Sequence, residues 1–95
     1  MANIIWSPSA LNDLDLIAEY ISRDSKDRAS LFIDRIIEQI QTLETNPNIG
    51  RIIPEIKRPE CRELLYGSYR LMYKIENNEI WITGVIHGAL NWNSE

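Results

Sequence analysis

The chain has 95 residues, of which 44% are hydrophobic and 25% are charged, a composition typical of a folded globular domain. This length predicts a single domain over residues 1–95 with one hydrophobic core. No apolar run approaches the roughly 18 residues that a membrane-spanning helix needs. The N-terminus lacks the basic region of a signal peptide, so we expect a cytoplasmic protein without membrane contact.

The net charge of −4 argues against indiscriminate binding to nucleic acid, which depends on Lys and Arg contacts with phosphates. The charge is unevenly distributed. Residues 50–75 carry six basic and three acidic side chains, whereas residues 1–49 carry four and eight, and residues 76–95 carry none and three. Cys61 and His87 are the only cysteine and histidine. The sequence therefore predicts no zinc site, and we expect no metal and no cofactor.

The first half of the chain predicts a strand and two helices. Residues 3–6 form a short apolar run, which Ser7-Pro8 ends with an N-cap residue and a proline at the first helical position. Two stripes with helical period follow, over residues 8–23 and 29–43, until Asn46-Pro47 stops the second. Because the polar link between the stripes is short, they predict an antiparallel helical hairpin.

The second half predicts a loop and an antiparallel meander. Residues 48–60 contain Gly50 and two prolines, which favours an ordered loop. Three strands follow, at Cys61–Tyr66, Tyr69–Ile75 and Glu79–His87, with a type II′ turn at Gly67-Ser68. The predicted fold is α+β, in the order β-α-α-β-β-β, with the helical hairpin on one face of a small, mostly antiparallel sheet.

Strand alternation predicts which side chains share a face of this sheet. If the helices cover the face that carries Leu71, then Arg70 lies on the open face; the opposite assignment also remains possible. Tyr73 would lie on the core side, with its hydroxyl at the margin. We expect Arg62, Arg70 and His87 to converge on the open face, joined by Arg51 from the loop.

Three guanidiniums in one place would recognise anions, because each presents a planar fork of donors that suits phosphate or carboxylate. A histidine beside them would add acid–base chemistry near neutral pH. Plainer interpretations stay open: the arginines form surface ion pairs with Glu55 and Glu63, Tyr73 packs in the core, and His87 is a satisfied residue at a strand end. Cys61 is interpreted as a small strand residue rather than a nucleophile.

Five motifs, in order and with compatible spacing over nearly the whole chain, resemble the ParE/RelE toxin superfamily. They are Leu14-x-x-Ile17-x-x-Tyr20-Ile21, Asn46-Pro47-x-x-Gly50-Arg51-x-x-Pro54-Glu55, Arg62-Glu63-Leu64, Tyr69-Arg70-Leu71-x-Tyr73 and Val85-Ile86-His87-Gly88. The second and third favour the ParE-like, plasmid-stabilisation branch. The resemblance implies the fold given above and the role of toxin in a type II toxin–antitoxin module. It also implies a cognate antitoxin whose C-terminal segment wraps the toxin in a hetero-oligomer.

The resemblance also implies roles for individual residues. Arg70 matches an arginine important in RelE-like nucleases, His87 falls near the C-terminal catalytic region, and Arg51 matches a basic loop position. For a nuclease we expect Arg62, Arg70 and His87 to be catalytic. For binding to the target or the antitoxin we expect a wider set: Arg51, Glu55, Arg62, Arg70, Tyr73, His87 and Trp92.

One departure from the family pattern bears on the activity. Relatives commonly carry arginine after the histidine, whereas no basic residue follows Lys74 here. RNA cleavage needs cations around the reacting phosphate, and losing one such contact costs roughly 10²–10³ in rate. This departure favours a non-enzymatic toxin, for which the resemblance to the ParE-like branch implies DNA gyrase as the target. The alternatives are a ribosome-dependent mRNA endoribonuclease of RelE type and, because Leu90 stands where arginine would be unsurprising, an attenuated toxin that only binds its antitoxin.

Overall fold

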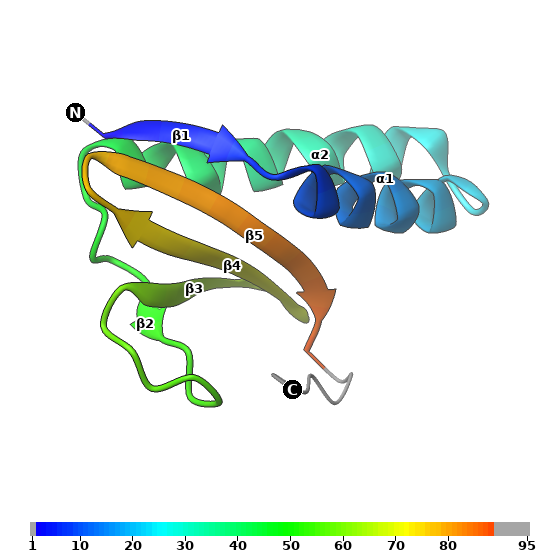
Figure 1. Cartoon of the computed structure of the whole chain (residues 1–95). Coiled ribbons are helices and arrows are strands. Elements are labelled where there is room, and N and C mark those ends of the chain that lie inside the picture. The colour runs from blue at the N-terminus through cyan, green and yellow to red at the C-terminus, as the bar shows by residue number, and fades with distance from the viewer. Residues whose placement is uncertain (1, 89–95) are drawn as a thin grey trace.

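A computed structural model describes residues 2–88 of the chain. Two helices lie against one face of a five-stranded sheet (Figure 1). The elements follow in the order β1 (Asn3–Trp6), α1 (Pro8–Ser22), α2 (Lys26–Gln41), the 3₁₀ turn η1 (Thr42–Glu44), β2 (Arg51–Ile52), β3 (Cys61–Tyr66), β4 (Tyr69–Glu76) and β5 (Glu79–His87). The predicted α+β fold and its element order are confirmed.

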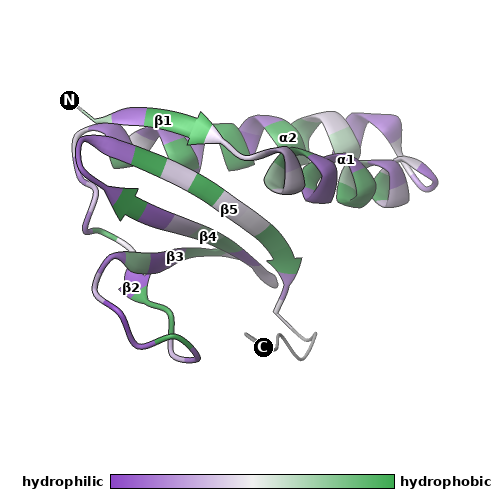
Figure 2. Cartoon of the chain, viewed as in Figure 1, coloured by the Kyte–Doolittle hydropathy of each residue, from purple (hydrophilic) through white to green (hydrophobic). Residues whose placement is uncertain are grey.

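Serine side chains begin both helices. The Oγ of Ser7 accepts a hydrogen bond from the backbone N–H of Ala10 at 3.1 Å, and Pro8 occupies the first helical position. The Oγ of Ser25 accepts in the same way from Arg28 at 3.1 Å. Each helix buries one apolar stripe against the sheet, and Figure 2 shows hydrophobic and hydrophilic bands along both. Most members of the stripes predicted from the sequence therefore pack against the sheet, whereas Leu11 and Ile37 are exposed.

The strands form one sheet in the order β1-β5-β4-β3-β2. β1 lies parallel to β5 at one edge, and the other pairings are antiparallel. Gly67 has φ +55°, as the first central residue of a type II′ turn requires. The two-residue strand β2 lies within the stretch expected to be loop. Pro54 follows it closely, and proline cannot continue a hydrogen-bonded ladder.

The core lies between the helices and one face of the sheet. Leu71 and Tyr73 of β4 are almost fully buried there, with relative exposures of 0% and 1%. Their partners from the helices and neighbouring strands are Ala10, Leu14, Phe32, Ile36, Ile40, Leu43, Ile80, Ile82 and Val85. Because Leu71 faces the helices, alternation puts Arg70 on the opposite, open face, as expected.

A bulge in β5 changes which of its side chains face the helices. Met72 pairs with Gly84 and Tyr73 pairs with Ile82, so Thr83 is left without an opposite residue. One extra residue reverses the alternation from that point onward. Val85 is therefore buried on the same face as Ile82, although simple alternation predicted opposite faces.

Candidate functional site

Four charged side chains form a connected network on the open face of the sheet. Arg70 donates from Nη1 and Nη2 to the two carboxylate oxygens of Glu55, both at 2.7 Å, and from Nε to Glu63 at 2.6 Å. Arg51 donates from Nε and Nη2 to the other oxygen of Glu63, each at 2.7 Å. The strand register explains why Arg51 contacts Glu63, because the two residues are opposite each other on β2 and β3. The order along the network is Arg51, Glu63, Arg70, Glu55.

The network neutralises its own charges. The Glu63 side chain is fully buried and that of Arg70 is 10% exposed, so neither charge reaches far into solvent. The hydrogen bonds from Arg70 hold the pKa of the Glu55 carboxyl at about 2, well below its usual value. The hydrogen bonds that Arg70 donates to Glu55 and to Glu63 raise the pKa of Arg70 above its usual value. Two of the three arginines expected to recognise anions, Arg51 and Arg70, are thus occupied by carboxylates of the same chain.

A second set of contacts fixes the loop before β2. The buried hydroxyl of Tyr73 accepts a hydrogen bond from the backbone N–H of Gly50 at 3.0 Å and donates to the carbonyl oxygen of Pro47 at 2.7 Å. Burial raises the pKa of Tyr73. A Cβ atom at Gly50 would lie only 2.6 Å from the Tyr73 hydroxyl oxygen and 2.7 Å from the carbonyl oxygen of Glu63. The glycine of the second motif is therefore explained by close packing of Gly50 on Tyr73.

Arg62 helps to hold the same loop. Its Nη1 donates to the carbonyl oxygen of Gly50 at 2.9 Å, and its Nε donates to that of Pro59 at 2.9 Å. Arg62 pairs with Tyr73 across β3 and β4, so it lies on the face that the helices cover and not on the open one. Its guanidinium meets neutral carbonyl groups only, which leaves its positive charge uncompensated among residues 2–88.

The expected convergence of Arg62, Arg70 and His87 on the open face is wrong. Register puts Arg62 opposite Tyr73, and the bulge puts His87 opposite Tyr69, on the helix-covered face. Of these three residues only Arg70 is on the open face. The side chains of Arg51 and Glu55 also extend to that face, where Arg51 contacts Glu63 and Glu55 contacts Arg70. Trp92 and Leu90 lie outside the described residues.

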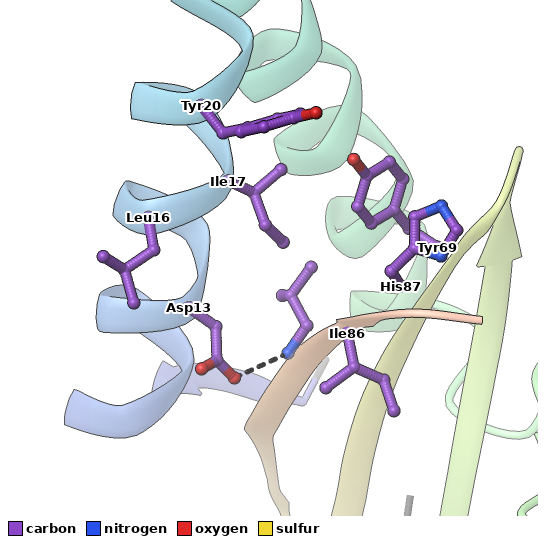
Figure 3. A pocket seen from close by; sticks show the side chains of 8 residues that line it. Asp13, Leu16, Ile17, Tyr20, Tyr69, Ile86 and His87 are labelled. Carbon is purple, nitrogen blue, oxygen red and sulfur yellow. Dashed lines mark hydrogen bonds between the residues drawn. The ribbon is translucent and has the colours of Figure 1, made fainter. Parts of the chain in front are cut away.

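His87 instead lines a groove between α1 and the end of β5. The groove has a volume of about 630 Å³. Tyr20 and Ile17 reach it from α1, while Tyr69 and His87 approach from the sheet with their rings edge to face at 5.2 Å (Figure 3). Its other lining residues are Asp13, Leu16, Val85 and Ile86. The groove is mainly apolar, which suits packing against an apolar segment better than phosphate chemistry.

The site residues expected from the sequence did not include two residues that organise these features, although Glu63 was considered as an ion-pair partner of the arginines. Glu63 forms ion pairs with both Arg51 and Arg70. The sequence contains these three charged residues, but only the strand register shows that they meet. The Oδ2 atom of Asp13 on α1 accepts a hydrogen bond from the backbone N–H of Val85 on β5 at 3.1 Å (Figure 3). A polar residue near the apolar stripe of α1 was the available signal for Asp13.

Neither helix in residues 2–88 is long and apolar enough to cross a membrane. The same residues contain no group of three or more His, Cys, Asp or Glu side chains arranged to hold a metal ion.

Comparison with known families supplies the assignment. The sequence model of the ParE toxin of the type II toxin–antitoxin system parDE matches residues 4–92, which is nearly the whole chain. This chain belongs to the ParE toxin family. None of the curated proteins matches it.

A solved structure supports the fold of this ParE-family toxin. A chain described as "Chromosomal ParDE TA system from P. aeruginosa" superposes with a TM-score of 0.76 at 24% sequence identity. The match covers 92% of the present chain and 96% of the other. The two proteins therefore share the same arrangement of helices and sheet, and the resemblance to the ParE-like toxins is confirmed.

Proposed function

We propose that this ParE-family toxin acts by binding a protein target, DNA gyrase, and that a cognate antitoxin neutralises it in a cytoplasmic hetero-oligomer. The family assignment provides the role of toxin in a type II module. The ParE-like resemblance implies gyrase as the target. In this proposal the toxin acts without cleaving RNA.

The self-neutralised arginine network is the observation that carries this choice. A nuclease needs cations free to meet the charge that develops on the phosphate in the transition state. Arg70 already donates three hydrogen bonds to Glu55 and Glu63, and Arg51 donates two to Glu63. Withdrawing Arg70 from this network would leave the fully buried carboxylate of Glu63 without its buried cation, which is unfavourable unless another cation replaces it.

The placement of His87 supports the same choice. A general acid–base must lie within hydrogen-bond reach of the reacting group, beside the cations that bind the phosphate. Here His87 and Arg70 lie on opposite faces of the sheet. The expected catalytic set therefore does not surround a common point in this arrangement.

The test is induced expression in bacteria, with and without co-expression of the cognate antitoxin, followed by two assays. Purified toxin is expected to inhibit DNA supercoiling by gyrase, and primer extension on cellular mRNA is expected to show no new ribosome-dependent cleavage. Message cleavage with intact gyrase activity would establish the nuclease alternative. Absence of growth arrest at every expression level would favour a chain that only binds its antitoxin.

A further inference from the structure

The groove between α1 and the end of β5 has the size and the lining of a small-molecule site. Its volume of about 630 Å³ lies within the range of roughly 300–1,000 Å³ that is typical of such sites. Its walls are aliphatic and aromatic, with Ile17 and Tyr20 on α1 and Tyr69 on β4 (Figure 3). Leu16 is 57% exposed and Tyr20 is 69% exposed. Large apolar side chains that stay this open beside a groove indicate a contact surface.

Two hydrogen-bond acceptors lie together on the outer edge of β5, where this strand borders the groove. β1 pairs with β5 only as far as Ile82, so within residues 2–88 the end of β5 continues beyond β1. There the backbone N–H of Val85 donates to Oδ2 of Asp13, which shows that this N–H points outward toward α1. Because the N–H and C=O of one residue in an antiparallel strand point to the same side, the carbonyl oxygen of Val85 also points outward. The carboxylate and this carbonyl oxygen can therefore accept from one donor group of a ligand.

The charges around the groove favour a cation over an anion. α1 contains Asp13, Asp15 and Glu19 and no basic residue. Among the described residues no Lys or Arg lines the groove. The ring of Tyr20 already attracts a cation, since the guanidinium carbon of Arg23 lies 6.0 Å from its centroid. A ligand carboxylate would meet Asp13 as a like charge, whereas an ammonium group would form an ion pair with it.

We propose that this groove is a binding site for a small organic cation, an amine that carries an aromatic or branched aliphatic group. The ammonium group donates to the carboxylate of Asp13 and to the carbonyl oxygen of Val85, which it can do at once because it has three N–H donors. The apolar group packs between the rings of Tyr20 and Tyr69. The inference concerns binding by the toxin alone, so it does not depend on the identity of the toxin's target.

The test is a titration of isotope-labelled, full-length toxin with three probes of one shape, followed by two-dimensional NMR. The probes are phenethylamine, phenethyl alcohol as the neutral analogue and phenylpropionate as the anionic analogue. We expect the amine to bind with a dissociation constant on the order of 1 mM, which is usual for so small a ligand. Its largest shifts should fall on the amides of Asp13, Tyr20 and Val85. The two analogues should bind about fivefold more weakly or less, since they lack a partly exposed ion pair.

Asp13→Asn tests the carboxylate, because the amide oxygen can still accept from the N–H of Val85 while the charge is lost. We expect about fivefold weaker binding of the amine and unchanged binding of the alcohol. The matched control is Asp15→Asn, which makes the same change at an exposed position of α1 outside the lining of the groove. A second variant, Tyr20→Leu, removes a ring that is mostly exposed and should weaken the amine and the alcohol alike. Melting temperatures confirm that each variant is folded.

The inference is overturned if the amine and the alcohol bind equally well, if the carboxylate analogue binds best, or if the shifts lie outside the groove. Equal binding of the amine by Asp13→Asn and Asp15→Asn would also overturn it. Should Asp13→Asn fail to fold, the comparison of the three probes on wild type and on Tyr20→Leu still decides the question. None of these results bears on gyrase inhibition, so the proposed function stands or falls separately.

Discussion

The guanidinium of Arg70 and the carboxylate of Glu55 form two parallel hydrogen bonds, each 2.7 Å long, across the open face of the sheet. Such a bidentate pair combines charge attraction with a fixed relative orientation. It ties the loop after β2 to the centre of the sheet. The pair therefore fixes the exposed loop that carries Glu55 to β4 and contributes to the stability of the fold.

This pair predicts a specific dependence of stability on acid. The pKa of Glu55 falls from 4.5 to about 2 in the folded protein. A lowered pKa stabilises the folded state above the unfolded value, and this stabilisation is lost as pH falls from about 4.5 to about 2. The melting temperature of wild type should thus decrease more between pH 5 and pH 2 than that of Glu55→Gln. Glu38→Gln, on the exposed side of α2, is the control and should follow wild type; identical curves for all three proteins would contradict the prediction.

Truncating Arg70 should destabilise the protein strongly. Arg70→Ala leaves the fully buried carboxylate of Glu63 with Arg51 as its only cation, and Arg51 is 54% exposed. Removing one partner of a buried pair costs about 3–5 kcal/mol. Arg51→Ala removes the exposed partner and should cost about 1 kcal/mol or less. Urea unfolding of the two variants measures the difference, and comparable losses would show that Glu63 depends equally on both arginines.

This expected instability affects how activity data are interpreted. A loss of toxicity in Arg70→Ala follows from unfolding as readily as from a missing catalytic group. Activity of this variant therefore has to be compared at equal amounts of folded protein.

The Tyr73 hydroxyl should contribute to stability through the loop that it holds. Tyr73→Phe leaves the N–H of Gly50 without its buried acceptor and the carbonyl of Pro47 without its donor. An unsatisfied buried group costs about 1–3 kcal/mol. Tyr66→Phe is the control, because the half-buried Tyr66 packs on Phe32 through its ring. Chemical denaturation should separate the two variants, and equal stability would mean that water replaces the Tyr73 hydroxyl.

Gly50 should resist substitution even when Tyr73 is altered. The Cβ of Gly50→Ala would lie 2.7 Å from the backbone oxygen of Glu63, and backbone moves less readily than a side chain. Overpacking of this kind costs about 1–3 kcal/mol. Gly50→Ala should therefore remain destabilising in a Tyr73→Phe background, measured by thermal unfolding. A fully rescued double variant would show that the hydroxyl alone causes the conflict.

The sequence predicted the elements well because each rests on local chemistry. Ser7 and Pro8 begin α1, Gly67 makes a tight turn, and the strand boundaries at Cys61–Tyr66 and Glu79–His87 match the structure. The site was predicted less well because it depends on register. Strand alternation assumes uninterrupted pairing, and the extra residue at Thr83 reverses it before His87.

The network shows a second limit of prediction from sequence. Arg70 and Glu55 were both expected to contact a partner, yet they contact each other. Whether an arginine serves a ligand or a carboxylate of its own chain depends on tertiary distances. The overall charge of residues 50–75 was nevertheless informative, because four cations remain after the internal pairs are removed.

His87 provides the sharpest test between binding and catalysis. A general acid–base contributes about 10²–10⁴-fold to a reaction rate, so a nuclease would lose nearly all activity in His87→Asn. In the proposed function His87 is a wall of the groove beside Tyr69 and not a catalyst, so growth arrest should persist in this variant. Colony counts after induction, at matched levels of folded toxin, measure the effect. Tyr20→Ala, on the opposite wall of the groove, is the companion variant. Loss of toxicity in His87→Asn but not in Tyr20→Ala would favour catalysis, whereas parallel changes in both would identify the groove as a binding surface.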